Sequence, residues 1–188
     1  RCEHPDIGGA ITNRHNWVVR YLAGKCRQKD KGGWHVMFDA GNADEGSTAQ
    51  TVPRWLLRRK PGKRKSRGSV ERAQEHPDID KLAAQKPDIV MLQGVRKGEL
   101  TAEVPGYIPN MFKVMILEVG YASDWRWEKR VEDKNLKYAP LAKAIADMGW
   151  EVEYKSLVVG ALGCVYEHGL QVTEWLGIKG KRAGKGVM

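Results

Sequence analysis

The stretch SDWRWEKRVEDKNLKYAPLAKAIADM, residues 123–148, decides the fold of this chain. Seven side chains recur in it at alternating intervals of four and three residues: Trp127, Val131, Lys134, Tyr138, Leu141, Ile145 and Met148. This spacing predicts one long helix whose stripe faces a core, and Gly149 is a good residue to end it. Lys134 is the exception in the stripe, because an ammonium group without a partner is costly to bury. The sequence therefore predicts an anion beside Lys134, and a side chain that reaches out to solvent is the alternative.

Two carboxylates at the ends of apolar, strand-like runs are candidates for that anion. Asp88 begins one run and Glu118 lies at the end of the next. Mg²⁺ prefers hard oxygen ligands, typically one or two carboxylates together with water and substrate oxygens. If the two strands are neighbours, both acids could hold Mg²⁺ or Mn²⁺, and Lys134 could orient a water or offset the charge of a phosphate. Lys137 and Tyr138 lie on an overlapping helix face and are further catalytic candidates.

The other apolar patterns predict a sheet flanked by helices. Strands are expected at 34–39, 88–95, 112–119 and 150–159, short helices at 53–59 and 80–85, and longer helices at 13–25 and 166–176, with Asn13 as the N-cap of the first. A long helix that follows two strands and leads into another indicates a mixed central sheet with helices on its faces. The expected fold class is α/β, in one domain over residues 1–178 with a basic, Gly-rich tail at 179–188.

Residues 40–84 carry no clear apolar pattern and are expected to be a basic insertion, either functional or disordered. Between residues 54 and 72 there are nine Lys and Arg against one Glu, so most of the net charge of +9 lies here. Such a run usually meets nucleic acid, and its binding should weaken with salt. A solvated linker or a nuclear import signal is the alternative. The candidate nucleic-acid-binding residues in it are Arg58, Arg59, Lys60, Lys63, Arg64, Lys65 and Arg67. In the first helix, Arg14 and His15 are candidates for phosphate or the catalytic pocket.

The bulk properties exclude some classes of protein. With 188 residues and 41% hydrophobic residues, the chain can bury a core and is not disordered throughout. No apolar run approaches the ~18 residues of a membrane span, so we expect no membrane partner. Its three cysteines are few, odd in number and far apart, which suits a reducing intracellular compartment.

A series of short motifs, taken in order, is similar to a known family. The series is Arg14-His15-Asn16, Asp39, Lys86-Pro87-Asp88-Ile89-Val90, Leu117-Glu118-Val119, Lys134 with Lys137-Tyr138, Gly149-Trp150, 158–163 and Leu176-Gly177-Ile178. Together they resemble the C-terminal restriction-like endonuclease domain of non-LTR retrotransposons, a branch of the PD-(D/E)-x-K nuclease superfamily. In most of that superfamily the lysine lies two residues after the second acid, where this chain has Gly120. The retrotransposon branch is similar to this chain in carrying the lysine on the following helix, at Lys134 or Lys137.

The resemblance implies a restriction-endonuclease-like sheet and a divalent-metal-dependent DNA endonuclease. It makes Asp88 and Glu118 the metal ligands, and it implies nicking of target DNA to prime reverse transcription, within a larger reverse-transcriptase polyprotein in the nucleus. The alternative is a catalytically inactive nucleic-acid-binding module, or a structural subunit of a nucleoprotein assembly, that uses the same fold and binds DNA or RNA through its basic insertion.

Overall fold

The protein contains one four-stranded mixed sheet with the strand order β1-β2-β3-β4. The computed structural model describes residues 5–28, 34–40, 52–59, 74–93, 113–123, 125–160 and 163–178, with side chains from residue 9 onward. The strands are β1 (Trp34–Phe38), β2 (Ile89–Gln93), β3 (Lys113–Ala122) and β4 (Glu151–Gly160). β2 pairs antiparallel with β1 and with β3, whereas β3 pairs parallel with β4. The predicted mixed α/β class is confirmed.

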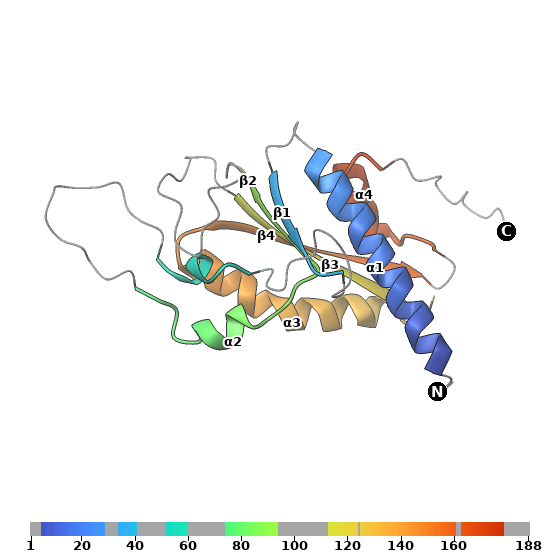
Figure 1. Ribbon diagram of the computed structural model, residues 1–188, viewed down its shortest axis with the longest axis horizontal. Coiled ribbons are helices and arrows are strands. Elements are labelled where there is room, and N and C mark those ends of the chain that lie inside the picture. The colour runs from blue at the N-terminus through green and yellow to red at the C-terminus, as the bar shows by residue number, and fades with distance from the viewer. Residues whose placement is uncertain are drawn as a thin grey trace, which may run out of the picture.

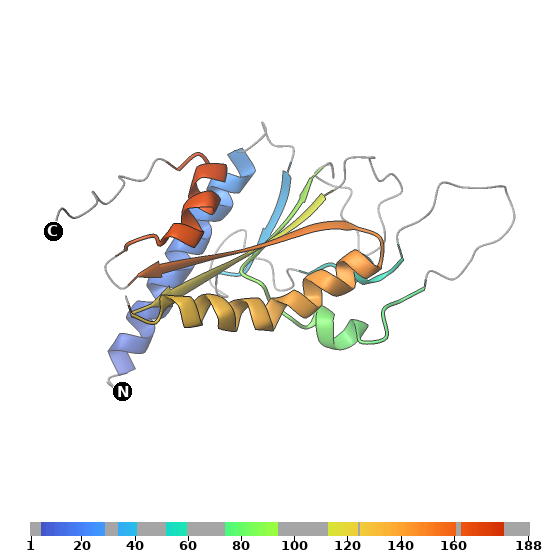
Figure 2. The same cartoon turned by 180° about the vertical axis from the view of Figure 1, so that it is seen from behind.

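Helices cover both faces of the sheet. They are α1 (Pro5–Gln28), the 3₁₀ helix η2 (Arg54–Leu57), α2 (Ile79–Ala83), α3 (Trp127–Asp147) and α4 (Glu167–Trp175). α1 and α4 lie side by side on one face, and α3 lies with α2 on the other (Figure 1). The reverse view in Figure 2 gives the same arrangement of three layers. Helices therefore approach the sheet from both of its faces.

α3 is the crossover that a parallel pair of strands requires, and it joins β3 to β4. Its predicted stripe is confirmed, since Tyr138, Leu141 and Ile145 are buried against the sheet. Pro140 lies inside the helix, where it removes one backbone hydrogen bond, and α3 bends along its length (Figure 2). The helix ends as predicted, because Gly149 adopts a φ of 87° that is unfavourable for other residues.

The start predicted for the first helix was wrong. Asn13 was expected to be its N-cap, but α1 begins at Pro5 and includes Asn13 in its interior. Proline is well tolerated in the first turn of a helix because that turn needs no N–H donor. The glycines that follow do not end the helix. α1 therefore begins eight residues before the predicted N-cap.

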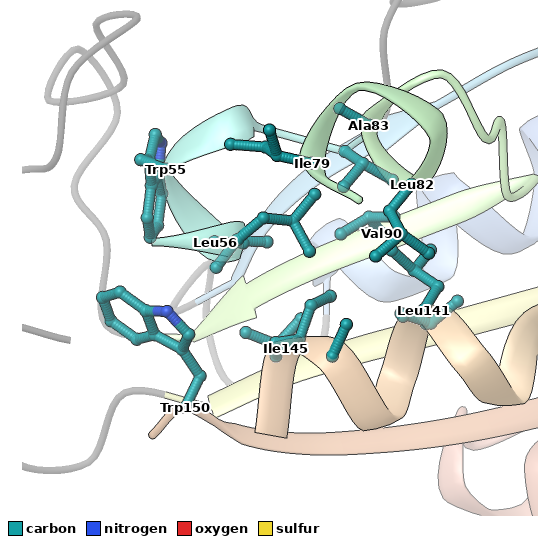
Figure 3. Packing of buried hydrophobic residues seen from close by; sticks show 14 of the residues in the cluster. Trp55, Leu56, Ile79, Leu82, Ala83, Val90, Leu141, Ile145 and Trp150 are labelled. Atoms are coloured by element: carbon teal, nitrogen blue, oxygen red, sulfur yellow. The ribbon is translucent and has the colours of Figure 1, made fainter. Parts of the chain in front are cut away.

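The expectation that residues 40–84 form an insertion outside the core does not hold for 52–59 and 74–84, which contribute buried residues. η2 and α2 pack their apolar side chains onto α3 and the sheet (Figure 3). The buried residues from 52–59 and 74–84 are Val52, Trp55, Leu56, Leu57, Ile79, Leu82 and Ala83. Trp55 packs edge-to-face on Trp150, with ring centroids 5.3 Å apart. The short helices expected at 53–59 and 80–85 are present, but a single turn leaves no period in the sequence to show that its residues are buried.

The opposite face of the sheet packs against α1 and α4. Val19, Leu22 and Cys26 of α1 are buried there against strand residues that include Met115 and Leu117. α4 approaches the sheet closely, because a Cβ on Gly169 would lie 2.7 Å from Leu157 Cδ1. The two cores hold the sheet rigidly between its helical layers.

Candidate functional site

Glu118 lies on the face of β3 that is covered by α3. Side chains alternate along a strand, so Ile116 and Glu118 face α3, whereas Leu117 and Val119 face α1 and α4. Glu118 is 0% exposed. Its Oε1 accepts a hydrogen bond of 2.8 Å from the backbone N–H of Asp88. A fully buried carboxylate must be paired or used, and in this protein it has partners on both oxygens.

Asp88 reaches the same place from the neighbouring strand. It directly precedes β2, whose first residue Ile89 is paired with Leu117 of β3. Asp88 Oδ2 accepts a hydrogen bond of 2.7 Å from the backbone N–H of Val119. Asp88 and the Glu118–Val119 pair thus hold each other through two side-chain-to-backbone hydrogen bonds. This reciprocal arrangement fixes both carboxylates across the β2–β3 pair.

Lys134 joins the two acids from α3. Its Nζ lies 2.5 Å from Glu118 Oε2 and 3.7 Å from Asp88 Oδ2. Its side chain is only 13% exposed, so the alternative of a lysine that reaches out to solvent does not hold. The three charged residues come from the position before β2, from β3 and from α3, and they meet on the α3 side of the sheet.

His15 adds a contact from the other helical layer. Its Nε2 lies 3.3 Å from Asp88 Oδ2, and its ring packs edge-on near Tyr121 with centroids 6.4 Å apart. The hydrogen bond with Asp88, strengthened by the charge of that carboxylate, raises the pKa of His15 although burial opposes the shift. Asp88 therefore lies between a residue of α1 and a residue of α3.

The two carboxyl groups have different acidities. Burial, followed by the negative charge of Asp88, raises the pKa of Glu118 to about 7, against the opposing effect of Lys134. Burial also acts to raise the pKa of Asp88, but the His15 hydrogen bond and the charge of Lys134 outweigh it and lower that pKa. Two acids whose environments push their pKa values apart are typical of a functional site.

Tyr138 and Lys137, the other catalytic candidates on α3, are placed differently from Lys134. The Tyr138 hydroxyl donates a hydrogen bond of 3.0 Å to the backbone carbonyl of Lys86, two residues before Asp88. Burial and the nearby Glu118 charge raise the pKa of Tyr138. Lys137 is exposed, and its Nζ lies over the Tyr138 ring at 4.5 Å. Of the two candidate lysines, Lys134 is therefore the one at the acids, and Tyr138 supports the backbone that carries Asp88.

Arg130 was not found by pattern analysis. A Cβ placed on Gly120 would lie 3.5 Å from Arg130 Cγ and 3.6 Å from its Nε. The missing side chain at Gly120 thus leaves room for Arg130 to lie over β3, two residues beyond Glu118. Arg130 is one helical turn before Lys134, so α3 places two cations in a row above the strand. The signal in the sequence was the Arg130–Lys134 spacing together with a glycine inside an apolar strand.

The predicted nucleic-acid contacts are dispersed. Arg14 is exposed on α1, and its backbone carbonyl accepts a hydrogen bond of 3.3 Å from the Tyr121 hydroxyl. Arg58 forms an ion pair with Glu75, with Nε and Oε1 2.8 Å apart, and Arg59 is exposed beside it. The remaining candidates, Lys60, Lys63, Arg64, Lys65 and Arg67, lie outside the described residues. The Arg58 guanidinium is thus paired within the protein, whereas the basic run suggested a cation free to bind nucleic acid.

The donor set can be tested against a divalent metal. Among the described residues, no group of three or more His, Cys, Asp or Glu side chains could hold a metal ion. Mg²⁺ does not need such a group, because one or two carboxylates usually suffice when water and phosphate oxygens complete its shell. Asp88 and Glu118 supply that number of hard oxygen ligands, and both approach the one cationic group of Lys134. The residues present therefore fit Mg²⁺ or Mn²⁺ and do not fit a closed zinc site.

The chain matches no known protein family, no curated protein and no solved structure. Within the described parts of the chain, none of the helices has the length and apolar character needed to cross a membrane.

Proposed function

We propose that this protein is a divalent-metal-dependent endonuclease that hydrolyses phosphodiester bonds of DNA, with a restriction-endonuclease-like fold. The observation that carries the proposal is the meeting of Asp88, Glu118 and Lys134 at the sheet. Two acids on adjacent antiparallel strands and a lysine on the next helix agree with the family that the sequence resembles. The strand order and the two helical layers are compatible with that fold.

Asp88 and Glu118 would hold the metal through their carboxylate oxygens. When bound, Mg²⁺ or Mn²⁺ would supply a Lewis acid and a source of activated water at neutral pH. The hydrogen bonds from the backbone N–H groups of Asp88 and Val119 fix the two carboxylates in place, which reduces the reorganisation needed during reaction. His15 contacts the same Oδ2 atom of Asp88 that accepts the Val119 hydrogen bond, and it restricts rotation of that side chain.

Lys134 and Arg130 would act on the phosphate. The Lys134 ammonium group can donate to a water or to a phosphate oxygen once it turns from Glu118, and its charge offsets the negative charge that develops in the transition state. Arg130 offers a planar guanidinium on the same side of β3, suited to two phosphate oxygens at once. Both cations lie on one rigid helix, which keeps their spacing constant.

The wider setting follows from the resemblance. We infer that DNA is the substrate, that the nick primes reverse transcription, and that the domain works beside a reverse transcriptase in the nucleus. The net charge of +9 supports a polyanionic partner. RNA remains an alternative partner for the basic run, since phosphate contacts alone do not distinguish the two nucleic acids.

A second candidate is a binding module without cleavage. The observation that favours it is the closed arrangement of charges: Lys134 occupies the position between the acids, and three carboxylate oxygens already have donors. If this ion pair never opens, the same fold would serve only to bind nucleic acid, as part of a nucleoprotein assembly.

Nicking of supercoiled plasmid tests the proposal. We expect conversion to open circles with Mg²⁺ or Mn²⁺ and none with EDTA, and a loss of at least roughly a thousandfold in Asp88→Ala because a metal ligand is removed. Asp147→Ala is the matched control, because Asp147 is exposed at the far end of α3 and pairs only with Lys143 among the described residues. Salt-sensitive binding without any nicking would support the binding module, and equal nicking by Asp88→Ala would contradict the enzyme.

A further inference from the structure

The outward face of α1 carries large aromatic side chains in solvent. The inward face packs Val19, Leu22 and Cys26 into the core, whereas Trp17 is 63% exposed and Tyr21 is 42% exposed on the opposite side. A tryptophan is seldom left so open on a helix that already has a core-facing side. The folding of α1 does not explain these two rings.

The two rings form an ordered stack with a cation. Trp17 and Tyr21 are one helical turn apart, and their rings are parallel within 6° with centroids 5.7 Å apart. Lys25, one further turn along, places its Nζ 5.5 Å from the centroid of the Tyr21 ring. The face thus presents two flat surfaces and an ammonium group in a line, already in fixed positions.

The charge of α1 favours a polyanion. From Gly9 to Gln28 the helix contains no Asp or Glu, and it contains the four cations Arg14, Arg20, Lys25 and Arg27. Arg14 and Lys25 share the outward side with the two rings by helical periodicity. The outer face of α3 differs, because its apolar groove around Leu136 includes Glu128 and Glu132. A chain of phosphates would be attracted to α1 and repelled by those acids.

We propose that Trp17, Tyr21 and Lys25 form a stacking site for single-stranded nucleic acid. Unpaired bases would stack on the two rings, and Lys25 with Arg14 would hold the adjacent phosphates. The role of this stacking site rests on the proposed function, because α1 also places His15 against Asp88. Binding itself needs neither metal nor the acids. A duplex would gain little from the rings, because its bases are already stacked.

The test measures binding of a fluorescent oligothymidylate by anisotropy, in EDTA, with the full chain carrying Asp88→Ala so that no cleavage occurs. In the double variant Trp17→Leu with Tyr21→Leu, we expect the Kd to rise roughly tenfold or more. Trp17→Phe with Tyr21→Phe keeps flat rings and should retain binding within about threefold. Leu136→Ala removes an exposed apolar residue from α3 and should leave the Kd unchanged. A duplex of the same length should bind both double variants nearly equally.

Two results would overturn the stacking site. The first is an unchanged Kd in the leucine pair. The second is preferential binding to vesicles of anionic phospholipid that both double variants retain, because leucine also partitions into lipid whereas stacking of bases needs an aromatic ring. Loss of plasmid nicking with retained, ring-dependent oligonucleotide binding would instead contradict the proposed endonuclease alone.

Discussion

The two faces of β3 have the same backbone and opposite characters. On the side of α1 and α4, Met115, Leu117 and Val119 are buried in a wholly apolar layer. On the side of α3, the row begins with apolar residues and continues to Glu118 and Gly120, where cations of α3 lie over the strand. Because side chains alternate along a strand, one residue of β3 packs in the apolar core and the next one faces the candidate site.

The difference between the two faces of β3 explains why a buried acid is tolerated at Glu118. Glu118 would be strongly destabilising among the side chains around Leu117. On the α3 side it meets a lysine and a backbone N–H, and its neighbour Asp88 is held in return. The core on the other face can then supply the stability that the charged group does not.

The largest expected effect separates the two candidate lysines of α3, Lys134 and Lys137. Lys134→Ala should lower the rate of plasmid nicking by about a hundredfold or more, because a charge beside the reacting phosphate is lost. Lys137→Ala should change the rate by less than about threefold, because Lys137 lies in solvent over Tyr138. Rates are compared per folded molecule after circular dichroism. The assignment of Lys134 fails if the two variants lose activity equally.

The pH dependence of stability sharpens the contrast between the faces. The pKa of Glu118 is raised from 4.5 to about 7 in the folded protein, so the folded state binds more protons than the unfolded state in that window. The free energy of unfolding should therefore fall as pH rises through it. Glu118→Gln removes this contribution, and relative to the wild type it should gain up to roughly 3 kcal/mol between pH 4.5 and 8. Urea denaturation without metal measures the difference.

Leu117→Ala is the control on the other face for that experiment. It should lose about 3 kcal/mol through the cavity it leaves, by the same amount at each pH, since no charge is involved. Parallel curves for wild type and Glu118→Gln would show that the carboxyl of Glu118 is not shifted by burial.

The smallest expected effect concerns the support of Asp88. Tyr138→Phe deletes the hydrogen bond to the Lys86 carbonyl and should cost about 1 kcal/mol of stability. Nicking should fall by about threefold to tenfold, because the backbone before Asp88 is less firmly held. Tyr154→Phe is the matched control, since its ring stacks on Tyr138 and the hydrogen bond to the backbone carbonyl of Lys86 comes from Tyr138. Equal effects in the two variants would remove the positioning role of Tyr138.

Much of the fold could be predicted because its strongest patterns are local. The stripe of α3 and the apolar runs of β2 and β3 identify their elements without knowledge of partners. The prediction that Lys134 has an anionic partner follows from the cost of burying its charge, and it is confirmed by Glu118 and Asp88. The strand pairing could not be derived, because the connection between β2 and β3 is too long for its turn residues to set a register.

What the sequence could not predict depends on tertiary contacts. The core role of Trp55 and Leu56 comes from a single turn against α3, which has no period to recognise. The position of Arg130 depends on Gly120 being opposite to it. Arg58 forms an ion pair with Glu75 because two separate segments of the chain meet at an isolated β-bridge. A count of charges in the sequence therefore overstated the number of cations that are free to bind nucleic acid.

The parallel pairing of β3 and β4 has a consequence for shortened forms of the chain. Every residue of the charged trio precedes residue 135, whereas β4, which pairs with β3 and contacts α3, follows it in the chain. A chain that ended after α3 would contain all three charged groups but would lack the strand that supports both β3 and α3. We expect such a shortened chain to hold the trio less firmly than the full chain does.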